Sequence, residues 1–173
     1  GLTTDTQDTT GRTLSERPVT VSREDVLAAL PRFTGEILQL PPMYSAIKIN
    51  GKKLYELARR GKEAERPARP VTVFELELLS GAGADYVLRV RCSKGTYIRA
   101  LCHDLGEALG CGGCMSSLRR TAAGRFSLTQ ARTMEEILAF AAQDDPQKLL
   151  LPVDELFAEF PAVSLTAEQT VRV

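Results

Sequence analysis

The amino-acid sequence predicts an α+β fold, in which antiparallel strand hairpins are mixed with amphipathic helices. Residues 71–79 begin with β-branched side chains, and residues 86–92 alternate between apolar and polar side chains, as in a half-buried strand. A glycine-containing turn at 81–83 joins the two runs, so we expect them to pair as a hairpin. Residues 97–109 instead carry apolar side chains at helical spacing. This mixture of hairpins and helices is typical of the α+β class.

Two helices are predicted from local signals earlier in the chain. Ser22 and Asp25 form a capping pattern ahead of a helical stripe that is expected to end at Gly35. The members of this stripe are Val26, Leu27, Leu30 and Phe33. A second, shorter helix is expected near residues 53–60, inside a segment that mixes apolar and basic side chains.

Weaker signals follow in the last third of the chain. Residues 117–128 have the character of a strand around Gly124. Thr133 with Glu136 forms a capping box, which predicts a helix that ends near residue 142. Residues 149–160 are short of periodic signals and contain prolines, so we interpret them as a connector.

The helix predicted over 97–109 has an unusual charge distribution at its start. Thr96 is the expected N-cap residue, and Gly110 lies where a helix commonly ends. Helix N-termini carry partial positive charge and favour acids, yet Lys94 and Arg99 lie at this end. We therefore expect these cations to meet an anion supplied from elsewhere, either a phosphate or a buried carboxylate.

Length and composition limit the classes of protein that fit. The 173 residues suffice for one domain, or for one domain and part of a second, and 43% are apolar. The 22 basic and 22 acidic residues balance, which argues against nonspecific polyanion binding outside a local patch. No membrane-spanning run and no signal peptide are recognised, so we expect a cytoplasmic protein. A reducing cytosol also predicts free thiols for Cys92, Cys102, Cys111 and Cys114.

A local patch of positive charge lies within residues 47–69. Eight basic residues stand there against three acids, which gives a local net charge of +5. The basic residues are Lys48, Lys52, Lys53, Arg59, Arg60, Lys62, Arg66 and Arg69. Tyr55 lies inside the patch and Tyr44 just before it. Basic side chains bind phosphates and aromatic rings stack on unpaired bases, so RNA binding is favoured over a merely solvated helix face.

Three other motifs are better explained by structure than by chemistry. Cys111 and Cys114 have the spacing of a zinc or redox pair, but no second ligand pair accompanies them. His103 is expected on a helix surface rather than as a base. Asp5 and Asp8 could bind magnesium, although a turn held by side-chain-to-backbone hydrogen bonds is favoured. No phosphate-binding glycine loop or dinucleotide fingerprint occurs, so nucleotide-cofactor chemistry is not expected.

Five segments, in order, resemble the TruB family of bacterial tRNA pseudouridine synthases. They are TTDTQDTTG (3–11), RFTGEILQLPPMYSAIKINGKKLYELARRG (32–61), RPVTVFELELL (69–79), RCSKGTYIRALCHDLGEALGCGG (91–113) and SLRRTAAGRFSL (117–128). The second and fourth segments are highly specific. The stretch from PPMYSAIK to ARRG resembles the bacterial stand-alone enzymes rather than their guide-RNA-dependent relatives.

The resemblance implies a fold, an activity and a substrate. The fold would be pseudouridine-synthase-like, with a mixed, largely antiparallel sheet and flanking helices. The enzyme would be an isomerase that converts the T-loop uridine at tRNA position 55 to pseudouridine. The glycosidic bond breaks, the base rotates, and it is rejoined through carbon, after the base has been flipped out of the loop. The family uses a catalytic aspartate, no metal and no organic cofactor, and no obligate protein partner is implied.

The resemblance also assigns roles to single residues. Arg99 matches the arginine that pairs with the catalytic aspartate. Tyr97 matches an aromatic residue that contacts the flipped uridine and is a candidate for the proton transfers. Leu118 matches an apolar residue that packs against that base. Lys48 lies in a mobile segment that clamps the T-loop, and Lys94 is expected near an RNA phosphate or the rim of the site.

The candidate RNA-binding side chains are distributed over the basic patch and two other sites. They are Tyr44, Lys48, Lys52, Lys53, Arg59, Arg60, Lys94 and Arg119. Composition alone would place the pair Arg119 and Arg120 on the surface without a further role. The clamping insertion, about 41–69, has few anchoring apolar residues, and we therefore expect it to be mobile in the absence of RNA.

One family motif has no counterpart in this chain. The catalytic aspartate of the family lies in a Gly-Thr/Ala-Leu-Asp-Pro motif, which is expected upstream of Gly1; Asp5 and Asp8 match a different stretch. Residues 1–150 are accordingly predicted to be the later part of the catalytic domain. Residues 151–173 would be a connector and the start of a C-terminal PUA-like domain. Such a piece alone would be inactive, and Arg99 would pair with a substitute anion or be exposed.

Other interpretations remain open at this point. The chain could be a non-catalytic tRNA-binding fragment, or it could derive from a guide-RNA-dependent relative that modifies ribosomal RNA. A cysteine-based redox or zinc protein is the least favoured interpretation.

Overall fold

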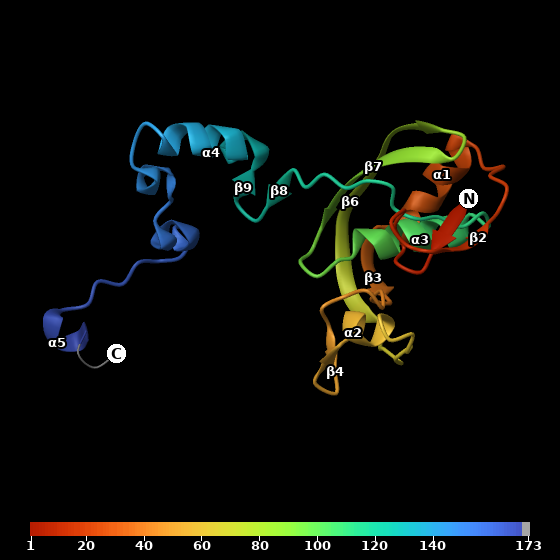
Figure 1. Ribbon diagram of the computed structural model, residues 1–173, viewed down its shortest axis with the longest axis horizontal. Coiled ribbons are helices and arrows are strands. Elements are labelled where there is room, and N and C mark those ends of the chain that lie inside the picture. The colour runs from red at the N-terminus through yellow and green to blue at the C-terminus, as the bar shows by residue number, and fades with distance from the viewer. Residues whose placement is uncertain (171–173) are drawn as a thin grey trace. The chain divides into compact units, whose positions relative to one another are not determined.

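The computed structural model describes residues 1–170 and divides the chain into two compact units, Gly1–Arg119 and Arg120–Val173 (Figure 1). Each unit is described by itself. The last three residues of the segment predicted over 151–173 lie outside the described residues. Over the described residues, no helix is long and apolar enough to cross a membrane.

The first unit is built on a three-stranded antiparallel sheet with the order β3-β6-β7. Its strands are β3 (Gly35–Gln39), β6 (Arg69–Ala82) and β7 (Asp85–Cys92). The alternation predicted over 86–92 is confirmed, because every second side chain of β7 is half-buried and the others are exposed. Strand β6 is longer than the predicted 71–79, and the turn falls at Gly83, whose φ is +61°. The α+β class is therefore confirmed.

Helix α1 (Arg23–Ala29) begins with the predicted capping box. Ser22 Oγ accepts a hydrogen bond from Asp25 N at 3.1 Å, and Asp25 accepts one from Ser22 N at 2.7 Å. The α-helix ends at Ala29, earlier than expected, and a 3-10 helix (Leu30–Phe33) follows it. Pro31 explains the change, because proline has no N–H to continue the α-helical ladder.

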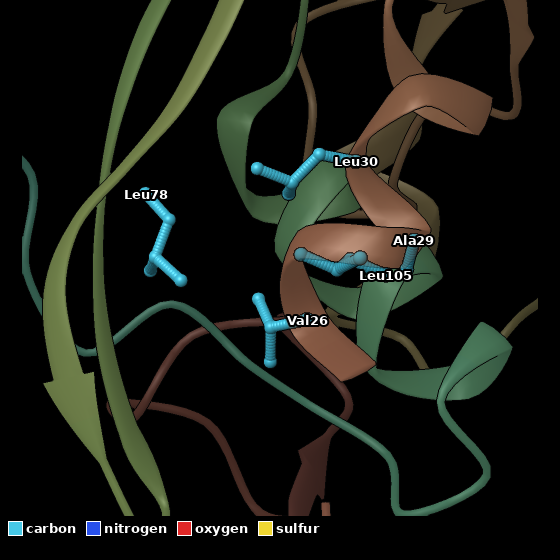
Figure 2. Packing of buried hydrophobic residues seen from close by; sticks show 5 residues of the cluster. All are labelled: Val26, Ala29, Leu30, Leu78 and Leu105. Carbon is cyan, nitrogen blue, oxygen red and sulfur yellow. The ribbon is translucent and has the colours of Figure 1, made fainter. Parts of the chain in front are cut away.

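The core of the first unit joins α1, β6 and α3 (Ile98–Ala108). Figure 2 shows Val26, Ala29 and Leu30 clustered with Leu105 of α3, and with Leu78 of β6 on the side of the sheet. All five side chains are buried. Burial of one such aliphatic side chain contributes about 1.5–3 kcal/mol relative to exposure. This packing fixes α3, and with it the direction in which its N-terminal residues project.

The predicted side chain Leu27 does not belong to this core. It is 45% exposed, whereas Val26 is 1% exposed. A helix of seven residues makes only about two turns at 3.6 residues per turn, so its buried face is narrow and Leu27 lies outside it. The stripe predicted from the sequence is therefore wrong at this position.

The N-cap of helix α3 lies one residue later than the predicted Thr96. Tyr97 is the N-cap residue, with no side-chain cap hydrogen bond. The hydroxyl of Thr96 donates instead to the carbonyl of Ser93 at 2.9 Å and closes the preceding turn. Gly110, with φ +81°, follows the end of the helix as predicted. Because Tyr97 is the cap, its backbone is extended and needs support from another element.

Two small hairpins complete the first unit. Strand β1 (Leu2–Thr4) pairs with β2 (Thr13–Glu16), and β4 (Lys48–Ile49) pairs with β5 (Lys52–Lys53). The second hairpin turns at Asn50 and Gly51, which both have positive φ, as a tight hairpin turn requires. Helix α2 (Leu54–Ala58) follows at once and matches the short helix expected near 53–60.

The second unit contains short elements only. The strand expected over 117–128 is two two-residue strands, β8 (Ala122–Ala123) and β9 (Phe126–Ser127), paired around Gly124. Helix α4 (Met134–Ala141) begins with the predicted capping box of Thr133 and Glu136. A 3-10 helix at Pro146–Leu149 leads into the predicted connector, which contains a second one at Val153–Phe157, and α5 (Ala167–Thr170) follows. The side chains of α4 are mostly exposed.

Candidate active site and nucleic-acid interface

Arg99 lies in the first turn of α3 and joins three parts of the first unit. Its Nη1 donates hydrogen bonds to the carbonyl of Thr6 at 3.0 Å and to a carboxylate oxygen of Asp8 at 3.1 Å. Its Nη2 donates to the carbonyl of Tyr44 at 2.8 Å. The guanidinium is therefore held between the loop after β1 and the start of the basic insertion. The side chains of Arg99 and Asp8 are only 23% and 17% exposed.

Asp8 is the local acid that meets Arg99. Its carboxylate also accepts hydrogen bonds from the Thr6 hydroxyl at 2.9 Å and from the Thr10 amide at 3.0 Å. Burial raises the pKa of Asp8, but these hydrogen bonds with Thr10, Thr6 and Arg99 together hold the pKa below its usual value. Asp8 is consequently a charged partner for Arg99 at neutral pH.

The acidic stretch at 5–8 is a turn, as favoured from the sequence. Asp5 accepts a hydrogen bond from the backbone of Arg12 at 2.8 Å, and Thr4 donates to the carbonyl of Asp8 at 2.6 Å. Gln7 has a φ of +62°, which belongs to a tight turn. Among the described residues, no group of three or more acids, histidines or cysteines is placed to hold a metal ion.

Arg99 keeps unused donor capacity. A guanidinium has five N–H donors, and the part of the chain that the structure describes supplies three hydrogen-bond acceptors for Arg99. Two of its donors therefore have no acceptor among the described residues. The chemistry expected at this helix end is thus compatible with the ion pair already present.

Tyr97 is positioned by Gln39, a residue that the sequence did not indicate. The side-chain amide of Gln39 donates to the carbonyl of Tyr97 at 3.0 Å and accepts from its backbone N–H at 2.8 Å. Gln39 ends strand β3 and is 2% exposed. A glutamine among apolar residues at a strand end has no local pattern that would reveal this contact.

Lys94 lies in the tight turn that precedes α3. Ser93 Oγ accepts a hydrogen bond from the amide of Thr72 at 3.0 Å, which attaches this turn to β6. Gly95 has a φ of +86° and allows the reversal. Lys94 lies three residues before Tyr97 in the chain and is exposed, so its side chain is free to meet solvent or a ligand.

Leu118 and Arg119 are not joined to Arg99 by the described contacts. Leu118 is 56% exposed, and Arg119 is also exposed. Met115 anchors the approach to these residues through backbone hydrogen bonds of 3.0 Å with Gln7 and Thr9, and the carbonyl of Ser116 accepts from the Thr9 hydroxyl at 3.4 Å. These bonds attach the approach to Leu118 to the same loop that carries Asp8. Within residues 1–170, Leu118 itself is mostly exposed, so its predicted packing against a base stays a prediction.

The basic insertion presents part of its charge to solvent. Four of its predicted RNA-binding side chains are exposed: Lys48, Lys52, Arg59 and Arg60. Lys53 differs, because its ammonium group donates to the hydroxyl of Tyr55 at 3.1 Å. Lys53 and Arg59 each lie over the Tyr55 ring, 5.3 Å from its centroid. These cation–π contacts involve the same Tyr55 ring that was proposed from the sequence for stacking on RNA bases.

The base of the insertion is better anchored than the sequence suggested. Leu54 is 0% exposed and Pro42 is also fully buried. Arg66 belongs to this base as well, since its Nε donates to the carbonyl of Pro41 at 2.6 Å. The expectation of few apolar anchors is therefore wrong for the base, while Lys48 and Lys52 of the hairpin β4–β5 and residues 59–63 after α2 remain exposed.

Two of the four cysteines, Cys102 and Cys114, lie in environments that disfavour the thiolate. Burial raises the pKa of the Cys102 thiol to about 11, with a smaller contribution from Cys114. Burial also raises the pKa of Cys114. All four cysteines are free. Thiolates are the reactive form, so the environment of these groups does not favour redox or zinc chemistry.

One cavity of about 590 Å³ lies away from this site. Its lining includes Cys102, Leu105 and Tyr86, and neither Tyr97 nor Arg99 belongs to it. The lining of the cavity is largely apolar, and of its charged residues Arg17 is already paired with Glu107. The candidate active site is therefore the N-terminal end of α3 rather than this cavity.

Solved structures define the class of fold. The chain aligns with a structure titled "Crystal Structure of a Cbf5-Nop10-Gar1 Complex" with a TM-score of 0.62 and 30% identity, over 81% of this chain and 40% of that one. A second match is titled "Structure of H/ACA RNP bound to a substrate RNA containing 2'-deoxyuridine", with a TM-score of 0.56 and 25% identity; it covers 78% of this chain and 36% of that one. The fold is accordingly that of the pseudouridine synthases.

The chain belongs to the TruB family. A family model described as "TruB family pseudouridylate synthase (N terminal domain)" matches residues 1–98. A second, described as "tRNA pseudouridylate synthase B C-terminal domain", matches residues 99–158. The two matches meet at the start of α3, between Tyr97 and Arg99, so the candidate site lies where both contribute.

Curated relatives support the same assignment. A tRNA pseudouridine synthase B of Azoarcus sp. (strain BH72) is 52% identical over 100% of this chain and 57% of its own length. The enzyme of the same name from Pseudomonas aeruginosa (strain UCBPP-PA14) is 49% identical over 96% of this chain and 56% of its own. The chain thus spans a little more than half the length of the curated relatives that it matches.

Proposed function

We propose that the whole protein to which this chain belongs is a pseudouridine synthase that acts on tRNA. Membership of the TruB family and relatives named tRNA pseudouridine synthase B support this proposal. The observation that carries it is the arginine at the start of α3, held beside Tyr97 with donor capacity left over. We take the T-loop uridine at tRNA position 55 as the target.

Arg99 is proposed to hold the catalytic aspartate. A guanidinium stays charged and can meet a carboxylate through two parallel hydrogen bonds. Asp8 and the carbonyls of Thr6 and Tyr44 orient the group before that aspartate binds. Such preorganised charge is a large contributor to rate when it is aimed at reacting groups.

Tyr97 is proposed to contact the flipped uridine. In the isomerisation the bond from the ribose C1′ to N1 breaks, the uracil rotates, and a bond from C1′ to C5 forms. The proton on C5 must then leave while N1 gains one, so the net composition is unchanged. The Tyr97 hydroxyl is a candidate for one of these transfers, and Leu118 is proposed to pack against the base.

The basic insertion is proposed to bind the T-arm. Lys48, Lys52, Arg59 and Arg60 are exposed and can contact phosphates, whereas Arg66 is used inside the insertion. Tyr44, Lys53, Lys94 and Arg119 are proposed as further RNA contacts. Residues 41–69 would act as a clamp whose exposed part orders on RNA.

The proposed organisation follows from these roles. Residues 1–150 would be the later part of the catalytic domain, and residues 151–173 a connector leading into a PUA-like domain. The enzyme would act in the cytoplasm without a metal, an organic cofactor or an obligate protein partner.

Tritium release from T-arm RNA labelled at C5 of uridine tests the proposed activity. The full-length protein is expected to release label from the wild-type T-arm and none when the target uridine is replaced by cytidine. Bare RNA must suffice as substrate, which separates this proposal from a guide-RNA-dependent enzyme. Binding without any label release would instead identify a non-catalytic RNA-binding protein.

A further inference from the structure

Gln39 makes an unusual pair of contacts with the backbone of the residue that caps α3. Its Nε2 donates to the carbonyl of Tyr97 at 3.0 Å, and its Oε1 accepts from the Tyr97 N–H at 2.8 Å. One side chain therefore satisfies both polar backbone atoms of one residue, in the manner of a neighbouring β-strand. The two residues are 58 positions apart in the sequence.

The cap residue has no other support for its N–H group. Tyr97 is extended, with φ −94° and ψ 106°, and α3 has no side-chain cap. The carbonyl of Tyr97 also accepts from Leu101 N at 3.1 Å, which starts the helical ladder. Among the described residues, Gln39 alone connects this N–H to the sheet. An orphaned buried N–H is costly, about 1–3 kcal/mol, so the contact is strongly favoured.

The chemistry of the side chain makes glutamine specifically suited to this position. A primary amide carries a donor and an acceptor side by side on one planar, uncharged group, at the spacing needed to meet the N–H and C=O of a single residue. A glutamate at this position could accept from the N–H but would place a charge against the carbonyl. An asparagine is one methylene shorter, so it could not reach both atoms from the same backbone position.

We propose that Gln39 is a positioning residue for the reaction: it sets the orientation of the Tyr97 side chain from β3 without touching the RNA. This inference rests on the proposed function. The amide clamp fixes the peptide on both sides of the Tyr97 Cα, and so fixes the direction in which the ring leaves the backbone. Arg99 follows two residues later in the first turn of α3, so its position depends on the same helix start.

The test replaces Gln39 in the full-length protein and measures pseudouridine formation on T-arm RNA. Gln39→Met keeps side-chain length and approximate volume while it removes both hydrogen bonds. We expect kcat to fall about 10- to 100-fold, since small displacements of reacting groups have effects of this size. KM is expected to stay within about twofold, because the exposed basic residues that bind RNA are unchanged.

A matched control is Tyr86→Phe. Tyr86 donates from its hydroxyl to the carbonyl of Val21 at 3.3 Å, which is also a half-buried link between two elements. It has no connection to Tyr97, so its loss is expected to leave kcat within about twofold of wild type. If Gln39→Met does not fold, Gln39→Asn keeps a polar amide at this position but is one methylene too short to reach both atoms of Tyr97, so it is expected to show the same loss of kcat.

A double-mutant cycle with Tyr97→Phe distinguishes positioning from a general structural effect. If Gln39 acts through the Tyr97 side chain, removing the tyrosine hydroxyl costs less in kcat in the Gln39→Met background than in wild type. Additive effects would overturn the inference, and so would an unchanged kcat in folded Gln39→Met protein. Absence of activity in the wild-type protein would instead contradict the proposed function.

Discussion

Arg99 is the residue on which the proposed chemistry depends most directly. Its charge is matched by Asp8 inside the chain, yet two carbonyls share the same guanidinium and donor capacity remains. An ion pair of this kind orients the arginine side chain but leaves some of its N–H donors without an acceptor. We infer that Asp8 acts on the reaction through Arg99 rather than by contact with the RNA.

Replacing Arg99 by alanine is expected to reduce stability. The change leaves Asp8 without its cation and the carbonyls of Thr6 and Tyr44 without a donor. Because the pair is partly exposed and Asp8 keeps its threonine partners, the expected loss is about 1.5–3 kcal/mol in the free energy of unfolding. Urea denaturation measures it, with Arg89→Ala as the control, since Arg89 pairs with Glu77 on the exposed face of the sheet. Equal unfolding midpoints for the two variants would contradict the role of Arg99.

The Asp8 carboxylate predicts a pH dependence of stability. Its pKa is lowered in the folded protein from the usual value of 3.8. The stabilisation is therefore fully present above that value and is lost as the pH falls through the folded pKa. Compared with Asp8→Asn, the wild-type protein is expected to be more stable near pH 6, with the difference shrinking toward pH 3. A constant difference over this range of pH, measured by urea denaturation, would show that the carboxylate charge is irrelevant.

The sequence predicted the anion requirement of Arg99 but not the identity of the partner. Charge at a helix N-terminus is a local signal, readable from Lys94 and Arg99 alone. The contact with Asp8 spans 91 residues and depends on how β1, its following loop and α3 pack together. Gln39 was missed for the same reason, because its partner is chosen by tertiary structure.

At the scale of elements, features set by local sequence signals were predicted correctly, whereas features set by tertiary pairing were not. The capping boxes that begin α1 and α4 were predicted because all their atoms lie within four residues. The length of β6 was underestimated, since its ends are stabilised by pairing with β3 and β7 rather than by β-branched side chains. The strand character expected over 117–128 is limited to β8 and β9 on either side of Gly124, because only these residues of the segment pair in a ladder.

The hairpin β4–β5 is the element expected to contribute most to the salt dependence of RNA binding. Lys48 and Lys52 are exposed on it and have no acidic partner among the described residues. Replacing both by alanine is expected to reduce the slope of log K against log salt concentration by about 1.4–1.8, if each contacts one phosphate. Fluorescence anisotropy with T-arm RNA, at several salt concentrations, measures this slope.

The matched control for this experiment is a double replacement of Arg89 and Arg91 by alanine. These exposed arginines lie on β7 and pair with Glu77 and Glu75. Removing them changes the net charge by the same amount but is expected to leave the slope within about 0.3 of wild type. An equal decrease in both double variants would mean that only the total charge of the protein matters.

At the scale of the whole molecule, the two compact units part after Arg119, while the family matches meet at residues 98 and 99. The boundary between two compact units depends on the density of tertiary contacts, which cannot be read from a sequence pattern. The family boundary instead falls after Ile98, the first residue of α3, and so separates the cap residue Tyr97 from Arg99. The residues that we propose for catalysis therefore depend on both matched segments, and neither segment alone contains the whole site.

The most direct test of the central claim is the single-turnover rate of pseudouridine formation on T-arm RNA by the full-length Arg99→Lys protein. Lysine keeps the positive charge but cannot reproduce the planar fork that holds Asp8, the two carbonyls and a further carboxylate. We predict a rate at least about 100-fold below wild type, since losing preorganised donors has effects of this size, with unchanged RNA affinity. A rate within about threefold of wild type, with Arg91→Lys as the control, would contradict the role of Arg99.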